Sequence, residues 1–148
     1  MYQAVFKRHA ELMKALANPK RLEVVHLLRQ GRLTVSEMER MLGLRQANLS
    51  QHLMVLRHIG VVATKRQGKE IYYSLTHPNF ARASELMRVV LMQRLGGRAA
   101  KAARQLTVVK DPVCGMRLTP AIAAQSYSLQ GRQYYFCGTG CAKEFKKL

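Results

Sequence analysis

Residues 34–62 read TVSEMERMLGLRQANLSQHLMVLRHIGVV, and this segment carries the clearest indication of the fold. Its first four residues, TVSE, form a capping-box pattern that starts a helix, and Gly43 is placed to end that helix. A second helix is expected to begin around Gln46, with three leucines spaced to share one face: Leu49, Leu53 and Leu56. Two helices joined by a tight turn that contains glycine are typical of a helix-turn-helix.

Two more helices are expected before this pair. Apolar residues recur at three- and four-residue spacing between Val5 and Leu16, which predicts a helix with one apolar face. Asn18 can cap the next helix, and Pro19 suits its first position, where a missing N–H costs nothing. Gly31 is placed to end that helix.

After the pair, the sequence predicts a β-hairpin and a last helix. Residues 61–64 and 71–75 read as strands, and the basic segment 65–69 between them contains a glycine. Residues 80–95 carry more apolar side chains than a lone surface helix requires. The expected fold is therefore mainly helical with a little β structure, a winged helix-turn-helix of order α-α-α-α-β-β-α.

Basic side chains dominate this part of the chain. The whole sequence of 148 residues has a formal charge of +17, and residues 1–106 hold 19 basic groups against 6 acidic ones. Such an excess predicts a polyanion as partner, and the fold indicates double-stranded DNA. The residues expected to meet base edges and phosphates lie on the second helix of the pair and in the hairpin: Gln46, Ala47, Asn48, Ser50, Gln51, Arg57, Lys65, Arg66 and Lys69.

Three separate blocks resemble the ArsR/SmtB family of repressors, and the resemblance covers about residues 3–95. The blocks are LANPKRL at residues 16–22, SQHLMVLRHIGVV at residues 50–62 and GKEIYYSL at residues 68–75. The resemblance implies a homodimer, joined through its first and last helices, that binds operator DNA and represses an operon until an inducer binds. The apolar content of residues 80–95 independently favours such a dimer.

The customary sensing sites of that family have no counterpart in this sequence. Many metal-sensing members carry a Cys-x-Cys pair in the helix before the reading helix, whereas residues 33–38 read LTVSEM and contain no thiol. Others use Asp and His ligands along the last helix, but here only His77 lies near it. We therefore expect the inducer to be sensed elsewhere in the chain.

All three cysteines lie beyond residue 106, at Cys114, Cys137 and Cys141. An odd number of thiols in a reducing compartment favours metal or redox chemistry over a disulfide framework. Residues 127–129 and 134–136 predict a hairpin, followed by a short helix whose start is expected to favour thiolate at the last two cysteines. A unit this small usually needs a bound metal ion or another cross-link to fold.

This C-terminal stretch resembles the YHS domain of the TRASH group, which is found appended to heavy-metal transporters and regulators. The resemblance rests on DPVCGM at residues 111–116 and on YYFC-x3-C-x3-F at residues 134–145. It implies coordination of a soft metal ion, most often copper.

Ligand chemistry narrows the choice of ion. Three thiols without a histidine suit Cu(I), and also Ag(I), Hg(II) or As(III). A closed zinc site needs four ligands, so zinc would require Asp111, water or another residue; Met116 could add a thioether. We expect ion binding to release the operator. Two alternatives stay open: thiols that sense oxidants or reactive sulfur, and a tail that is a structural zinc or metal-storage module.

These observations define the expected organisation. A winged-helix DNA-binding and dimerisation domain is expected at residues 1–97, a linker or helix extension at 98–106 and a YHS-type metal-binding domain at 107–148. With no secretory signal and no apolar run of about 20 residues, we expect a cytoplasmic protein without a membrane partner. No Cys-x-x-Cys motif, phosphate-binding loop or carboxylate cluster indicates catalysis, so neither an enzyme nor a small organic substrate is expected.

Overall fold

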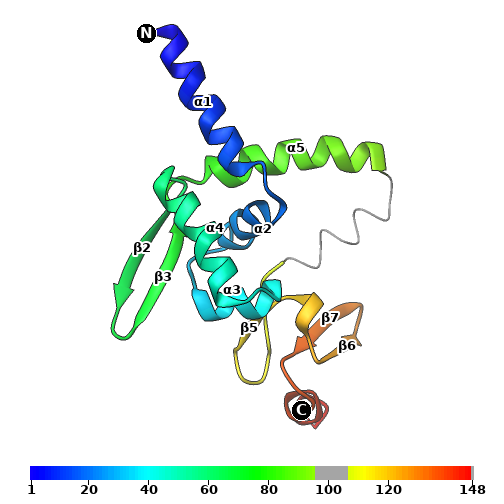
Figure 1. Ribbon diagram of the computed structural model, residues 1–148. Coiled ribbons are helices and arrows are strands. Elements are labelled where there is room, and N and C mark those ends of the chain that lie inside the picture. The colour runs from blue at the N-terminus through cyan, green and yellow to red at the C-terminus, as the bar shows by residue number, and fades with distance from the viewer. Residues whose placement is uncertain (96–106, 148) are drawn as a thin grey trace. The chain divides into compact units, whose positions relative to one another are not determined.

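The computed structural model describes residues 1–95 and 107–147, and the chain divides into two compact units, Met1–Leu91 and Met92–Leu148 (Figure 1). The elements up to residue 95 are, in chain order, α1 (Tyr2–Leu16), α2 (Pro19–Leu28), β1 (Leu33–Thr34), α3 (Val35–Leu42), α4 (Gln46–His58), β2 (Val62–Gln67), β3 (Glu70–Leu75) and α5 (Asn79–Leu95). The later elements are β4 (Val109–Lys110), β5 (Arg117–Leu118), the short 3-10 helix η1 (Pro120–Ile122), β6 (Gln125–Leu129), β7 (Arg132–Phe136) and α7 (Thr139–Phe145).

Asn18, Thr34 and Gly43 cap their helices as predicted, whereas α2 ends at Leu28, with Arg29 and not Gly31 as its C-cap. The Asn18 side-chain oxygen accepts hydrogen bonds from the Lys20 and Arg21 backbone N–H groups at 3.0 and 3.2 Å. The Thr34 hydroxyl accepts from the Glu37 N–H, and the Glu37 carboxylate accepts in return from the Thr34 N–H, which completes the capping box. Helix α3 ends at Gly43, whose φ of +62° suits glycine. The helix-turn-helix prediction is thereby confirmed.

A three-stranded antiparallel sheet, ordered β1-β3-β2, replaces the simple hairpin that the sequence predicted. The unforeseen strand β1 has two residues, and Leu33 pairs with Tyr73 of β3. Strands β2 and β3 pair as far as Gln67 and Glu70, so the turn consists of residues 68–69 alone. Figure 1 shows this hairpin as a long wing. Because β2 is longer than predicted, Lys65 and Arg66 lie within a strand and not in the turn.

The core of the first unit lies between α2, α3, α4 and the inner end of the sheet. Two terminal helices contribute little to it: α1 buries Leu16 and α5 buries Ala81. Figure 1 shows the N-terminal part of α1 extending away from the other helices of this unit. The other buried apolar side chains are Val24, Val25, Leu27, Leu28, Leu33, Met38, Met41, Leu49, Leu53, Leu56, Val61 and Val62.

The second unit is small and has two antiparallel strand pairs, β4 with β5 and β6 with β7. The predicted hairpin is confirmed, although its turn is tighter than expected and β7 already begins at Arg132. Phe145 of α7 packs against Tyr134 and Phe136, with ring centroids 4.9 and 5.2 Å apart. Among the described residues of this unit, only Leu118 and Phe136 are buried apolar side chains. A core of this size is too small to stabilise the fold without a metal ion or another cross-link.

Candidate metal centre and DNA-binding surface

A tight turn between β4 and β5 presents the first cysteine. The Asp111 N–H donates to the Met116 carbonyl and the Gly115 N–H donates to the Asp111 carbonyl, both at 2.9 Å. Gly115 has a φ of +74°, which few other residues adopt without strain. This turn leaves Cys114 exposed.

The structure brings the three cysteine sulfurs together. The Sγ atoms of Cys114 and Cys137 are 3.4 Å apart, and those of Cys137 and Cys141 are 3.7 Å apart. With a carboxylate oxygen of Asp111, these potential ligand atoms all lie within 4.8 Å of one another. A thiolate sulfur lies about 2.3 Å from a bound zinc ion, so two sulfurs sharing such an ion are at most about 4.6 Å apart. The donor set therefore fits a single thiophilic ion.

Asp111 is almost completely buried beside the sulfurs, with 1% of its surface exposed. Its Oδ1 accepts from the N–H groups of Val113 and Cys114 at 2.8 and 3.3 Å, and its Oδ2 accepts from the Cys137 N–H at 2.8 Å. Burial alone would raise the pKa of this carboxyl, but the donated hydrogen bonds outweigh burial and hold the pKa well below its ordinary value. The side chain is therefore an ionised carboxylate. The sequence had indicated Asp111 only as a fourth ligand for zinc.

The thiols of Cys137 and Cys141 hold their protons more tightly than ordinary thiols. Hydrogen bonding to Asp111, then to Cys114, together with burial, raises the pKa of Cys137 to about 12. Burial raises the pKa of Cys141 as well. The expectation that the start of α7 favours thiolate is therefore wrong, because the neighbouring carboxylate and burial outweigh the N–H groups of a helix of seven residues. An ion must displace these protons when it binds.

The residues predicted to contact DNA lie on exposed parts of α4 and the wing. Six of these residues lie on α4 and three basic ones lie on the wing, and all nine are exposed. Arg66 Nε donates to the Gly68 carbonyl at 3.2 Å, which ties the strand to its turn. The exposed set is Gln46, Ala47, Asn48, Ser50, Gln51, Arg57, Lys65, Arg66 and Lys69.

Two helices of the first unit carry exposed apolar side chains. Those of α1 are Tyr2, Val5, Phe6 and Met13. Those of α5 are Leu86, Met87, Val89, Val90 and Leu91. Large apolar surfaces of this kind are uncommon on a monomer and indicate an interaction surface.

A charged cluster at α2 and α5 was missed by the sequence analysis. Arg88 pairs with Glu85 within α5, and Arg29 Nη1 lies 3.7 Å from the Glu85 carboxylate. Burial, followed by the charges of Arg29 and Arg88, lowers the pKa of His26. Because these residues are far apart in the sequence, no local pattern could have revealed the cluster.

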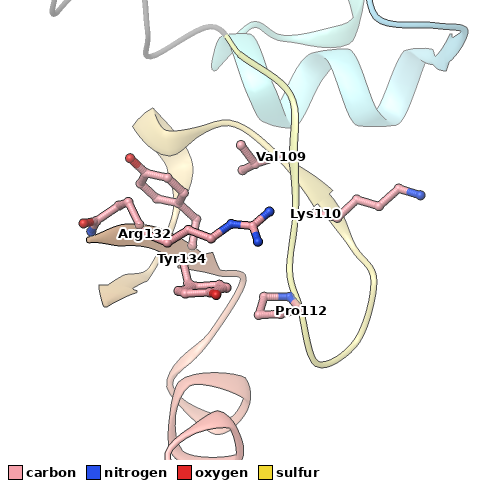
Figure 2. A pocket seen from close by; sticks show the side chains of 7 residues that line it. Val109, Lys110, Pro112, Arg132 and Tyr134 are labelled. Atoms are coloured by element: carbon pink, nitrogen blue, oxygen red, sulfur yellow. The ribbon is translucent and has the colours of Figure 1, made fainter. Parts of the chain in front are cut away.

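A hollow of ≈ 380 Å³ in the second unit lies beside the cysteine turn and contains no cysteine (Figure 2). Figure 2 shows the Arg132 side chain reaching from β7 toward β4, between Val109 and Pro112. Its guanidinium carbon lies 5.9 Å from the ring centre of Tyr134. The hollow is thus separate from the sulfur cluster.

Comparison with known proteins identifies the family. Residues 18–64 match the family described as bacterial regulatory protein, arsR family, and residues 109–147 match the YHS domain. A biofilm growth-associated repressor of Agrobacterium fabrum is 42% identical over 90 residues, which cover 59% of this chain and 77% of that protein. This chain belongs to the ArsR family of bacterial regulators. It carries a YHS domain at residues 109–147.

Solved ArsR-family structures confirm the fold class. The repressor BigR from Xylella fastidiosa is 36% identical, with a TM-score of 0.54 over 62% of this chain and 97% of that one. The homodimeric winged helix-turn-helix domain of Mb0332 from Mycobacterium bovis is 32% identical, with a TM-score of 0.59 over 64% of this chain and 87% of that one. These relatives are transcriptional regulators, and neither matched family is catalytic. Within the described part of the chain, no helix has the length and apolarity needed to cross a membrane.

Proposed function

We propose that this chain is a repressor that binds operator DNA as a homodimer and releases it when a soft metal ion binds Cys114, Cys137 and Cys141. The observation that carries the proposal is the convergence of three sulfurs from two separate segments of the YHS domain. In this proposal residues 1–97 bind DNA and dimerise, and residues 107–148 bind the ion. The proposed linker or helix extension, residues 98–106, lies outside the described residues.

The exposed residues of α4 and the wing support the DNA-binding role. The α4 residues Gln46, Asn48 and Gln51 have short polar groups of the kind that read base edges in a major groove. Lys65 and Lys69 present charge to phosphates, so affinity falls steeply as salt concentration rises.

The exposed apolar side chains of α1 and α5 support the dimer. A relative with the same fold is described as homodimeric. Pairing of two copies through these helices would remove the apolar surface from water and place two α4 helices on successive major grooves of a near-palindromic site.

Cu(I) is the proposed inducer. The site offers three sulfurs and, among the described residues, no histidine within its ligand group. Thiolate donors select Cu(I) and other thiophilic ions, whereas carboxylate and water suit harder ions. Ag(I), Hg(II) and As(III) are expected to substitute for it.

The decisive experiment is an anaerobic titration of operator affinity with Cu(I), Ag(I), Hg(II), As(III) and Zn(II). In the unchanged protein the soft ions lower operator affinity by about 5- to 150-fold, the usual range of such coupling. A variant with Cys114→Ser, Cys137→Ser and Cys141→Ser binds the operator equally well but no longer responds. Ser128→Ala, at an exposed position of β6, is the control and responds normally. A triple variant that still responds contradicts the proposal.

Thiol oxidation is a second candidate, favoured by the short distances between the sulfurs. Hydrogen peroxide would take two hydrogens from the Cys137 and Cys141 thiols, forming one disulfide and two molecules of water. The raised pKa of Cys137 argues against rapid attack, because the thiolate is the nucleophile. Release of the operator by peroxide in chelator-treated protein, without any response to metal, favours this second candidate.

A further inference from the structure

The Asp111 carboxylate links the two segments that carry the sulfurs. We propose that Asp111 is a positioning residue and not an ion ligand, so that a bound ion meets a donor set of sulfur only. This inference rests on the metal site of the proposed function, and it adds the residue that builds that site.

Both oxygens of Asp111 are engaged with backbone from the two sides of the cluster. Oδ1 holds the turn through the N–H groups of Val113 and Cys114, and Oδ2 holds the Cys137 N–H, 26 residues further along the chain. The bonds at 2.8 Å are the length expected of N–H groups that donate to a charged acceptor. One side chain thus fixes the distance between the Cys114 and Cys137 backbones.

Using Asp111 as a ligand would disturb this arrangement. The side chain is 1% exposed, and a carboxylate that turned toward an ion would leave part-buried N–H groups without their acceptor. Soft ions also gain little from an oxygen donor when three thiolates are at hand. Cys114 is exposed and the other two cysteines are half-buried, whereas Asp111 is almost completely buried, so solvent reaches the cysteines more readily than the carboxylate.

X-ray absorption of the full-length protein loaded with Cu(I) tests the donor set directly. The expected spectrum contains sulfur scatterers and no oxygen scatterer around copper. An oxygen scatterer that is present in the unchanged protein and lost in Asp111→Asn overturns the inference while leaving the proposed function intact. Failure to bind Cu(I) at all contradicts both.

The variant Asp111→Asn tests the positioning role separately. Its remaining carbonyl oxygen can still accept from Val113 and Cys114, but its NH₂ group faces the Cys137 N–H and cannot accept. Amide hydrogen exchange followed by NMR is therefore expected to show lost protection at Cys137 and retained protection at Val113. Affinity for Cu(I), measured by competition with a chelator, is expected to fall by about 10- to 100-fold, as for other partners that orient metal ligands.

Glu144→Gln is the matched control, because it removes the same charge from the same unit. Glu144 is exposed on α7 and pairs with Lys147. This control keeps both Cu(I) affinity and protection of the Cys137 amide. Unchanged Cu(I) affinity in Asp111→Asn overturns the positioning role, and metal-free operator binding by both variants shows that the DNA-binding unit is unaffected. If Asp111→Asn does not fold, the X-ray absorption spectrum of the unchanged protein still shows whether an oxygen atom binds the copper.

Discussion

Asn18 fixes the start of α2 through one side-chain oxygen that serves two backbone N–H groups. Replacing it with alanine leaves both donors without that partner, so Asn18→Ala is expected to lower the free energy of unfolding by about 1 kcal/mol. Chemical denaturation monitored by circular dichroism measures the change. Asn48→Ala, on the exposed face of α4, is the control and is expected to stay within about 0.5 kcal/mol. Equal effects of the two substitutions would contradict the capping role.

His26 makes stability depend on pH. Burial and the nearby Arg29 and Arg88 lower its pKa in the folded protein below the ordinary value of 6.5. As the pH falls below that value, the unfolded chain takes up a proton that the folded chain refuses, so stability is full at higher pH and declines on acidification. Urea denaturation between about pH 7 and pH 5 is expected to show this decline, and His26→Gln to reduce it.

The control for this titration is His58→Gln, which changes an exposed histidine. It is expected to leave the pH dependence as it is in the unchanged protein. If the stability of His26→Gln depends on pH as strongly as that of the unchanged protein, other groups cause the effect.

Under the proposed function, the single elements α4 and the wing make different contacts with DNA. Lys69, in the turn of the wing, is placed to contact phosphate, so Lys69→Ala is expected to weaken binding to all duplexes alike and to reduce the salt slope by about 1. Asn48→Ala, by contrast, is expected to cost about 1–3 kcal/mol at one base pair of the site. Fluorescence anisotropy over a series of salt concentrations and duplex sequences separates the two effects.

Lys143→Ala removes the same charge from α7 of the YHS domain and serves as the control for Lys69→Ala. Its salt slope is expected to match that of the unchanged protein. If both lysine variants lower the slope equally, net charge and not the wing carries the phosphate contacts.

The local signals in the sequence predicted the elements that depend on local chemistry. The caps at Asn18 and Thr34 and the leucines of α4 were readable because each depends on residues within a few positions. Strand β1 was not readable, since two residues have no detectable alternation and acquire their structure by pairing with Tyr72 and Tyr73.

The candidate metal centre likewise has features that the sequence predicted and features that depend on the fold. The three cysteines could be named from their spacing and from the resemblance to the YHS domain. The hydrogen bond from the Cys137 N–H to Asp111 spans 26 residues. The raised pKa of Cys137 comes from side-chain hydrogen bonds to Asp111 and Cys114 and from burial. Neither could be derived before the two segments were placed side by side.

At the scale of the whole molecule, the exposed apolar side chains of α1 and α5 predict the assembly state. Val90→Glu puts a charge where a partner helix is expected to pack, because Val90 is 49% exposed on α5. The variant is expected to sediment as a monomer at concentrations where the unchanged protein is a dimer, and to lose most of its operator affinity. Analytical ultracentrifugation measures the first effect. Gln93→Glu, an exposed charge change on the same helix, is the control and is expected to remain a dimer.

The proposed release of the operator requires that ion binding and operator binding weaken each other, and such coupling is reciprocal. An ion that weakens operator binding must itself be bound more weakly, by the same factor, when the operator is present. Cu(I) affinity of the full-length dimer, measured anaerobically by chelator competition with and without operator duplex, is predicted to differ by about 5- to 150-fold. Equal Cu(I) affinities in the two conditions would show that ion binding at the sulfur cluster does not change affinity for the operator.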